Sequence, residues 1–338
     1  MKLLISALEK SANIHLSRLL KELDSPQITG IFDKSLGPSI ADLQDISVMG
    51  FVDAVKKIGY FLNLKKKMTN LAKDADKVLL IDSSGFNLPL AKDIKKRYPH
   101  KEIIYYILPQ AWAWRRGRVK KVVEYVDRAC SILPFEKEIY PKDYNISYVG
   151  HPLLDEIKSF KSEPSKSDKV VFMPGSRRYE VQSLMPLFKK VAKKIDKEAV
   201  LVVPDNLDLS LYGDISGFTV TKEAHKALFE ADFAFICSGT ATLEASLIGT
   251  PLALVYKAKK IDYFLAKTFA HIDRVGLANI MLDDVHPEFL QDAANEENLL
   301  RAYREADTEK FLQNSLRLRE YLKFGSAKNV ARVIDGKL

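Results

Sequence analysis

Short apolar runs alternate along the chain with longer segments in which apolar residues recur at helical spacing. The short runs predict buried strands, because a parallel strand is covered on both faces and lacks polar alternation. In the first half we expect strands at residues 3–8, 78–82, 102–108, 129–133 and 147–149. The helical segments between them predict parallel sheets, since a parallel neighbour requires a crossover connection.

A polar stretch without periodicity, residues 158–168, predicts a linker, and the alternation then starts again. Further strands are expected at 169–173, 199–203, 218–220, 233–237 and 251–256, with charged helices from about Pro287 onward. The pattern predicts an α/β protein with two Rossmann-like doubly wound domains, residues 1–157 and 168–338, the second carrying the C-terminal helices. Because such sheets bind ligands at the carboxyl ends of their strands, we expect both domains to face one cleft.

The length of 338 residues fits two domains, because a single α/β core seldom grows beyond about 250 residues. An apolar content of 47% excludes a disordered chain. No apolar run approaches the roughly 20 residues of a spanning helix, and the first residues lack the apolar core of a signal peptide, so we expect a cytoplasmic protein. Cys130 and Cys237 each lie in an apolar run and are predicted to be buried thiols.

The formal net charge of +8 indicates an acidic partner, which can be nucleic acid, an anionic membrane face or a phosphorylated substrate. Residues 51–68 combine apolar positions at helical spacing with lysines. Such a helix can lie in a membrane interface, although packing on a core with a solvated basic edge is more common. Residues 112–118 (WAWRRGR) can stack on bases or recognise a phosphorylated sugar lipid.

Two carboxylates follow expected strands of the first domain. Asp82 directly follows the run 78–81, where it can serve as a general base for an acceptor hydroxyl. It can equally cap a helix that begins near Phe86. Glu9 ends the first strand, and there the simpler interpretation, in which Ser11 caps the following helix, is favoured.

Two strand-to-helix turns of the second domain are typical of phosphate binding. In residues 172–177 (FMPGSR), the backbone amides of a Gly-Ser turn and the guanidinium of Arg177 can hold a diphosphate, although a plain turn with a solvated arginine is the alternative. Residues 237–244 (CSGTATLE) place a small polar turn before a helix whose first amides can bind phosphate. Glu244 can then accept hydrogen bonds from ribose hydroxyls, but a helix capped by serine or threonine explains the spacing equally well.

Metal chemistry is not expected. Asp74 and Asp76 form a DxD sequence, which holds a divalent metal in some glycosyltransferases, but here it precedes a strand and should lie on the surface away from the predicted cleft. The six histidines show no HxH or HExxH spacing. We therefore predict neither a metal nor a cofactor.

Taken in order, several motifs resemble the lipid-A-disaccharide synthase family. They are residues 49–50 (MG), Pro109 with 112–115 (WAWR), 133–136 (LPFE), 150–152 (GHP), 174–177 (PGSR) with Glu180, and 238–240 (SGT) with 243–244 (LE). The resemblance extends from Ala7 to about Asn279. Two motifs are altered: residues 7–13 (ALEKSAN) stand for the family's A-G-E-x-S-G-D, and residues 82–87 (DSSGFN) for D-x-P-D-F-N.

The resemblance implies a GT-B type fold and a metal-independent inverting transfer in lipid A biosynthesis. The donor would be UDP-2,3-diacylglucosamine, the acceptor the 6-hydroxyl of 2,3-diacylglucosamine 1-phosphate, and UDP would be released. A UDP-sugar epimerase of the same architecture is the alternative. The resemblance also implies peripheral attachment to the inner membrane surface through the basic apolar helix and no nucleic-acid partner. A homodimer is a further expectation, which does not come from the resemblance.

Roles for single residues follow from the same resemblance. Asp82 is implied as the catalytic base, and Arg177 with the turn at 238–240 would stabilise charge on the leaving diphosphate. Glu244 would hold the ribose, Asn279 would lie near the nucleotide, and Glu9 would contact substrate. The expected substrate-binding set is Glu9, Ser11, Asn87, Trp112, Arg115, Arg177, Glu180, Ser238, Gly239, Thr240, Glu244 and Asn279.

Overall fold

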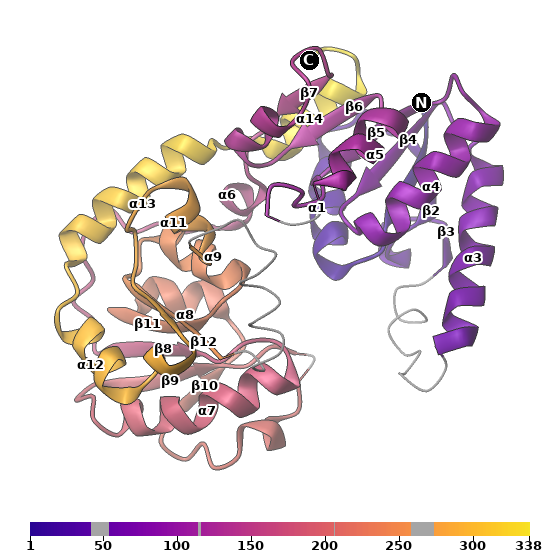
Figure 1. Cartoon of the computed structure of the whole chain (residues 1–338). Coiled ribbons are helices and arrows are strands. Elements are labelled where there is room, and N and C mark those ends of the chain that lie inside the picture. Colours follow the sequence, from indigo (N-terminus) through magenta and orange to yellow (C-terminus); the bar gives the residue numbers. More distant parts are fainter. Residues whose placement is uncertain (42–53, 114–115, 206, 258–273) are drawn as a thin grey trace. The chain divides into compact units, whose positions relative to one another are not determined.

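The computed structural model describes residues 1–41, 54–113, 116–205, 207–257 and 274–338 (Figure 1). The chain divides into two compact units. The first unit comprises Met1–Asp155 and Leu322–Leu338, and the second comprises Glu156–Tyr321. Each unit is built on an open parallel sheet, as the alternation of apolar runs and helical segments predicts.

The sheet of the first unit has seven strands in the order β3-β2-β1-β4-β5-β6-β7 across the described residues. Its strands are β1 (Lys2–Ala7), β2 (Gln27–Ile31), β3 (Ser39–Ala41), β4 (Lys77–Ile81), β5 (Glu102–Tyr106), β6 (Arg128–Ser131) and β7 (Ile146–Tyr148). The order reverses between β1 and β4, which pair in parallel. In doubly wound sheets, ligands bind outside the carboxyl ends of the strands at such a reversal.

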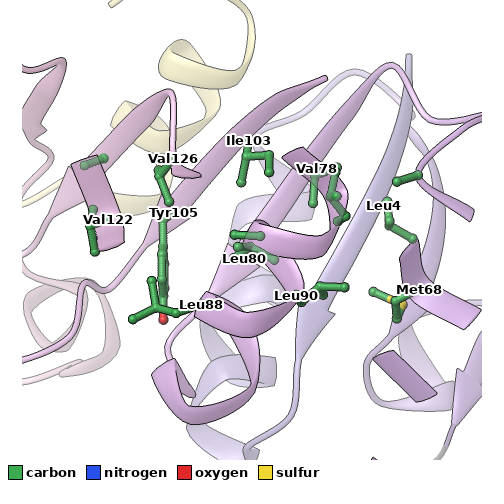
Figure 2. Packing of buried hydrophobic residues seen from close by; sticks show 14 of the residues in the cluster. Leu4, Met68, Val78, Leu80, Leu88, Leu90, Ile103, Tyr105, Val122 and Val126 are labelled. Carbon is green, nitrogen blue, oxygen red and sulfur yellow. The ribbon is translucent and has the colours of Figure 1, made fainter. Parts of the chain in front are cut away.

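Alternate residues of each strand enter different cores, because successive side chains of a strand point to opposite faces. On one face Leu80 and Tyr105 pack with the helices α3 (Ala54–Leu71), α4 (Ser84–Arg97) and α5 (Gly117–Tyr125), as Figure 2 shows for part of this cluster. On the other face Ile5 and Leu79 pack with α1 (Lys10–Lys21) and α14 (Ser326–Ile334).

The helix α14 belongs to the first unit, whereas we expected the chain to end within the second domain. The buried stripe Val330, Val333 and Ile334 packs on the β1 and β4 face beside α1. Polar contacts add to this packing, because the Lys77 ammonium donates to the Ile334 carbonyl at 2.6 Å. An amphipathic stripe indicates that a helix is half buried, but it does not indicate which sheet the helix covers.

The second unit has a six-stranded sheet in the order β10-β9-β8-β11-β12-β13 in its described part. Its strands are β8 (Lys169–Met173), β9 (Glu198–Val202), β10 (Thr219–Thr221), β11 (Phe233–Cys237), β12 (Leu252–Tyr256) and β13 (Glu288–Leu290). Its helices include α7 (Arg178–Ala192), α8 (Ala224–Glu230), α9 (Thr240–Ile248), α11 (Leu277–Met281), α12 (Glu296–Arg304) and α13 (Thr308–Leu322). The core stacks Phe172 on Phe235 with ring centroids 5.2 Å apart.

Short elements connect these layers. They are α6 (Pro152–Glu156) and the 3₁₀ turns η1 (Lys34–Leu36), η3 (Pro134–Ile139), η4 (Leu209–Tyr212) and η5 (Gln291–Ala293). Cys130 and Cys237 are buried free thiols, as predicted, and burial raises the pKa of each to about 12. No helix among the described residues has the length and apolar character needed to span a membrane.

The ten expected strands are all present within two residues of their predicted limits, but β2, β3 and β13 were not predicted. β3 and β13 are only three residues long, and all three strands are only partly buried, so they lack a continuous apolar run. In β2, Gly30 has φ +133°, and a Cβ there would lie 2.0 Å from the Ile5 carbonyl oxygen. The close approach of β1 and β2 therefore requires glycine at this position.

Candidate active site

Asp82 directly follows β4 at the carboxyl edge of the first sheet, which is the edge where the parallel strands end. Both Asp82 and Ser83 have left-handed backbones, with φ values of +51° and +43°. Such a conformation costs about 1 to 3 kcal/mol for a residue other than glycine, so the surroundings must hold it. The Asp82 carbonyl accepts hydrogen bonds from the Tyr105 hydroxyl at 2.6 Å and from the Asn87 amide at 2.8 Å.

Asn87, which we expected to bind substrate, is completely buried. Besides the bond to Asp82, its nitrogen donates to the Ile81 carbonyl at 3.2 Å. Its oxygen accepts the Ser6 hydroxyl at 2.6 Å. The amide is therefore used within the protein, where it supports the strained turn that carries Asp82.

The Asp82 carboxylate is only partly hydrated. Burial, and then the nearby charge of Glu9, raise the pKa of Asp82, whereas the Ser83 amide and His15 oppose the shift. The Ser83 amide donates to Asp82 Oδ1 at 2.7 Å. Ser83 occupies the cap position of α4, so the alternative in which Asp82 caps this helix is not what the structure has. A raised pKa makes the carboxylate a better proton acceptor.

Glu9 is brought to the same place. It is exposed at the cap position of α1, and its Oε1 accepts the Ser83 hydroxyl at 3.0 Å. Ser83 therefore links the two strand-terminal carboxylates that the sequence predicted. Ser11 lies inside the first turn of α1 and is exposed, so it is not the cap residue we considered.

Asn13, which stands where the family pattern has aspartate, is buried. Its nitrogen donates to the carbonyls of Ala7 and Glu9, both at 2.8 Å, and its oxygen accepts the Asp33 amide at 2.7 Å. A carboxylate could not donate the first two hydrogen bonds. In this chain an amide thus fixes the loop between β1 and α1.

Trp112 packs edge-on against Phe135, with ring centroids 5.2 Å apart, beyond the carboxyl ends of β5 and β6. Next to it Glu136 is buried and accepts the Ser131 hydroxyl at 2.6 Å. Burial raises the pKa of Glu136 to about 7, although several hydrogen bonds oppose the shift. We did not place Glu136 in the site, although the LPFE sequence contains it. Arg115 and Trp114 lie outside the described residues, as do residues 49–50.

In the second unit, Glu180 organises the turn between β8 and α7. Its Oε2 accepts the amides of Ser176 and Arg177 at 3.0 and 3.2 Å. Its Oε1 accepts the Arg177 guanidinium at 2.8 Å. Two amides that we expected to hold a diphosphate are thus already bonded to a buried carboxylate. The Arg177 side chain remains 80% exposed, so its other donors face solvent.

Gly175 has φ +109°, and a Cβ there would lie 2.5 Å from Glu180 Oε2. The glycine therefore permits Glu180 to approach the turn, and the P-G-S-R-x-x-E spacing encodes the whole arrangement. Arg177 lies at the tip of this turn, as predicted, and Glu180 has a supporting role inside it.

The second turn precedes α9, whose cap residue is Gly239. No side chain caps this helix in the described structure, so the serine- or threonine-capped helix that we considered is not present. Gly239 and Thr240 are exposed, Ser238 is half-buried, and no atom lies within 4 Å of the Cβ position of Gly239. The first turn of α9 therefore offers its partial positive charge to solvent at the carboxyl edge of the sheet.

Glu244 lies one turn into α9, and its Oε2 is 3.4 Å from Nε2 of His225 on α8. The Glu244 side chain is 18% exposed, so a ligand can reach it. His225 follows a short, partly polar strand and belongs to no recognised spacing. The sequence therefore contained no signal for this pair.

Asn279 is 1% exposed and its amide is fully used inside the second unit. The nitrogen donates to the His286 carbonyl at 2.8 Å and to Glu288 Oε1 at 2.7 Å. The oxygen accepts the amides of Val285 and His286 at 2.8 and 3.1 Å. These hydrogen bonds of Asn279 thus connect α11 to the segment before β13. Contact of Asn279 with a nucleotide stays a prediction.

Asp76 lies at the opposite, amino edge of the first sheet, where its carboxylate accepts the Lys2 amide at 2.7 Å. Asp74 and Asp76 are both exposed, as predicted. The part of the chain that the structure describes contains no cluster of three or more histidine, cysteine or acidic residues suited to a metal ion.

Solved structures share this architecture over almost the whole chain. The calicheamicin glycosyltransferase CalG4 aligns with a TM-score of 0.62 at 12% identity, covering 100% of this chain and 98% of that one. MurG of Acinetobacter baumannii aligns with a TM-score of 0.60 at 13% identity, covering 99% of each chain. A putative UDP-N-acetylglucosamine 2-epimerase from Listeria monocytogenes gives 0.63 at 13%, covering 98% and 94%. The fold is therefore that of the GT-B glycosyltransferases, and the epimerase has the same fold.

Sequence comparison is more specific. The family model described as lipid-A-disaccharide synthetase matches residues 3–324. The lipid-A-disaccharide synthase of Helicobacter pylori strain J99 is 48% identical over 352 aligned positions, covering 97% of this chain and 96% of that protein. That of Campylobacter jejuni strain RM1221 is 44% identical over 361 positions, covering 98% of each. The chain belongs to the lipid-A-disaccharide synthetase family.

Proposed function

We propose that the protein transfers 2,3-diacylglucosamine from its UDP conjugate to the 6-hydroxyl of 2,3-diacylglucosamine 1-phosphate. The products are the β-1,6-linked disaccharide 1-phosphate and UDP. The observation that carries this proposal is the Asp82 turn, a strained and internally braced loop that presents a carboxylate of raised pKa beside Glu9. Family membership supports the same reaction.

In the proposed mechanism, Asp82 accepts the proton of the acceptor 6-hydroxyl while that oxygen attacks the anomeric carbon of the donor. The bond between this carbon and the diphosphate breaks, and the electron pair leaves with UDP. Attack from the face opposite the diphosphate inverts the anomeric configuration. Glu9 contacts the acceptor sugar, with Ser83 holding its carboxylate next to Asp82.

The second unit stabilises the negative charge that develops on UDP as it leaves. The exposed Arg177 guanidinium and the uncapped first turn of α9 both present positive charge at the carboxyl edge of its sheet. Glu244 accepts hydrogen bonds from the ribose.

The substrates carry acyl chains, and we propose that α3 meets them at the inner membrane surface. Ile58 and Leu62 lie one turn apart on this helix and are 62% and 56% exposed. Lys66 follows one turn later and is exposed. Two exposed aliphatic side chains next to a cation suit the headgroup region of an anionic bilayer. Leu62→Ser should lower the fraction that sediments with anionic vesicles, whereas unchanged sedimentation would remove α3 from this role.

Mass spectrometry of the products tests the reaction. Purified protein incubated with UDP-2,3-diacylglucosamine and 2,3-diacylglucosamine 1-phosphate should yield the disaccharide 1-phosphate in equal amounts with and without chelator. Incubation with UDP-N-acetylglucosamine alone separates the alternative, because an epimerase converts this compound. Conversion of UDP-N-acetylglucosamine without any disaccharide formation would overturn the proposal. A homodimer stays a prediction, which light scattering of the purified protein tests.

A further inference from the structure

His225 and Glu244 lie on neighbouring helices of the second unit, with 3.4 Å between Nε2 and Oε2, a distance at which the imidazole can donate to the carboxylate. His225 is the second residue of α8, which follows β10, and Glu244 lies one turn into α9, which follows β11. Both positions are near the start of a helix that leaves the carboxyl edge of the same sheet. The side chains are 38% and 18% exposed, so solvent reaches both partners.

Two lysines near the start of α8 are paired with other carboxylates. Lys226 lies 3.6 Å from Glu223, and Lys222 lies 3.1 Å from Asp205. All four of these side chains are more than 60% exposed. In this part of the described structure neither lysine is paired with Glu244, whereas the His225 imidazole faces it.

We propose that His225 is a positioning residue of the nucleotide subsite, which holds the Glu244 carboxylate in the orientation that accepts the ribose hydroxyls of a uridine diphosphate. The inference rests on the proposed function, because it takes Glu244 as the ribose ligand. With Oε2 held by the imidazole, Oε1 and the remaining lone pair of Oε2 can accept two neighbouring hydroxyls. A glutamate fixed in this way before binding loses less side-chain entropy when the ligand arrives.

Isothermal titration calorimetry with UDP, together with steady-state kinetics in the donor, tests the inference. We expect His225→Ala to weaken UDP binding and raise the donor KM by about fivefold to tenfold, the effect of one ordinary hydrogen bond. The kcat should change less than twofold, because the ribose is remote from the reacting carbon. His225→Arg keeps a donor within reach of Glu244 and should restore most of the affinity. Lys226→Ala, one residue away, is the matched control and should bind UDP normally.

A diphosphate of 2′,3′-dideoxyuridine separates positioning from a general structural effect. Without ribose hydroxyls Glu244 has nothing to hold, so wild type and His225→Ala should bind this analogue equally. In a Glu244→Ala background, His225→Ala should have no further effect on UDP affinity.

Two results would overturn the positioning role: unchanged UDP affinity in His225→Ala, or an equal loss for UDP and its dideoxy analogue. A wild-type protein that binds UDP but forms no disaccharide would instead contradict the proposed function while leaving the His225 measurement valid. A wild-type protein that does not bind UDP would overturn both.

Discussion

Replacing Asn87 by alanine should destabilise the first unit and slow the reaction together. The side chain is completely buried and makes three hydrogen bonds, to Ser6, Ile81 and Asp82, of 2.6 to 3.2 Å. Each such bond contributes about 1 kcal/mol, and a buried group left without a partner costs about 1 to 3 kcal/mol. The Asp82 carbonyl keeps its bond from Tyr105, so we expect the free energy of unfolding to fall by about 2 to 4 kcal/mol.

Urea unfolding followed by tryptophan fluorescence reports on the stability of the first unit, because both tryptophans, Trp112 and Trp114, fall within its residue range. Asn63→Ala is the matched control, since Asn63 is exposed on α3, and its stability should stay within about 0.5 kcal/mol of wild type. If Asn87 positions Asp82, kcat falls while the KM of each substrate changes little. A loss below about 1 kcal/mol would contradict the bracing role. A raised KM with normal stability would show that Asn87 contacts substrate instead.

Three further substitutions follow from the same contacts. Asp82→Asn should raise stability at pH 7, because the pKa of Asp82 is raised on folding and its ionised form destabilises the native state above the folded pKa. The difference from wild type should vanish in thermal melts below pH 3.8, and a constant difference at all pH values would contradict this. Glu180→Gln should lower the free energy of unfolding by about 1 to 3 kcal/mol, because the amide cannot accept every hydrogen bond of the turn. An unchanged free energy in urea unfolding would show that the turn forms without the Glu180 carboxylate. Gly30→Ala should lower the free energy of unfolding by more than about 3 kcal/mol or prevent folding, whereas Gly59→Ala, with open space around it, should not. Equal expression and melting temperatures of the two variants would show that the approach of β1 and β2 does not require glycine.

Much of the fold could be predicted because its strands are covered on both faces. A run such as 78–81 (VLLI) is buried over its whole length, so hydrophobicity alone identifies β4. The strand β13 (Glu288–Leu290) is only half-buried along its length and has no such run. The assignment of α14 to the first unit depends on tertiary packing against α1, which no local pattern encodes.

The candidate site could be predicted only as far as its backbone positions. A carboxylate after a buried strand must lie at the carboxyl edge of a parallel sheet, and Asp82 and Glu9 both do. Where each side chain is directed depends on contacts between distant residues. Glu180 accepts the amides of its own turn, and the Asn279 amide is saturated inside the protein, although both resembled ligand-binding residues in the sequence.

Proton transfer to Asp82 is the central step of the proposed reaction, and a single-turnover experiment tests it directly. Excess wild-type or Asp82→Asn protein is mixed with both substrates, and disaccharide formation is followed after donor and acceptor binding have been shown to be normal. The asparagine keeps the size of the side chain and an oxygen for the Ser83 amide, but it cannot accept the hydroxyl proton. We predict that the rate of the chemical step falls by about two to four orders of magnitude. A rate within a few-fold of wild type would show that another group removes the proton.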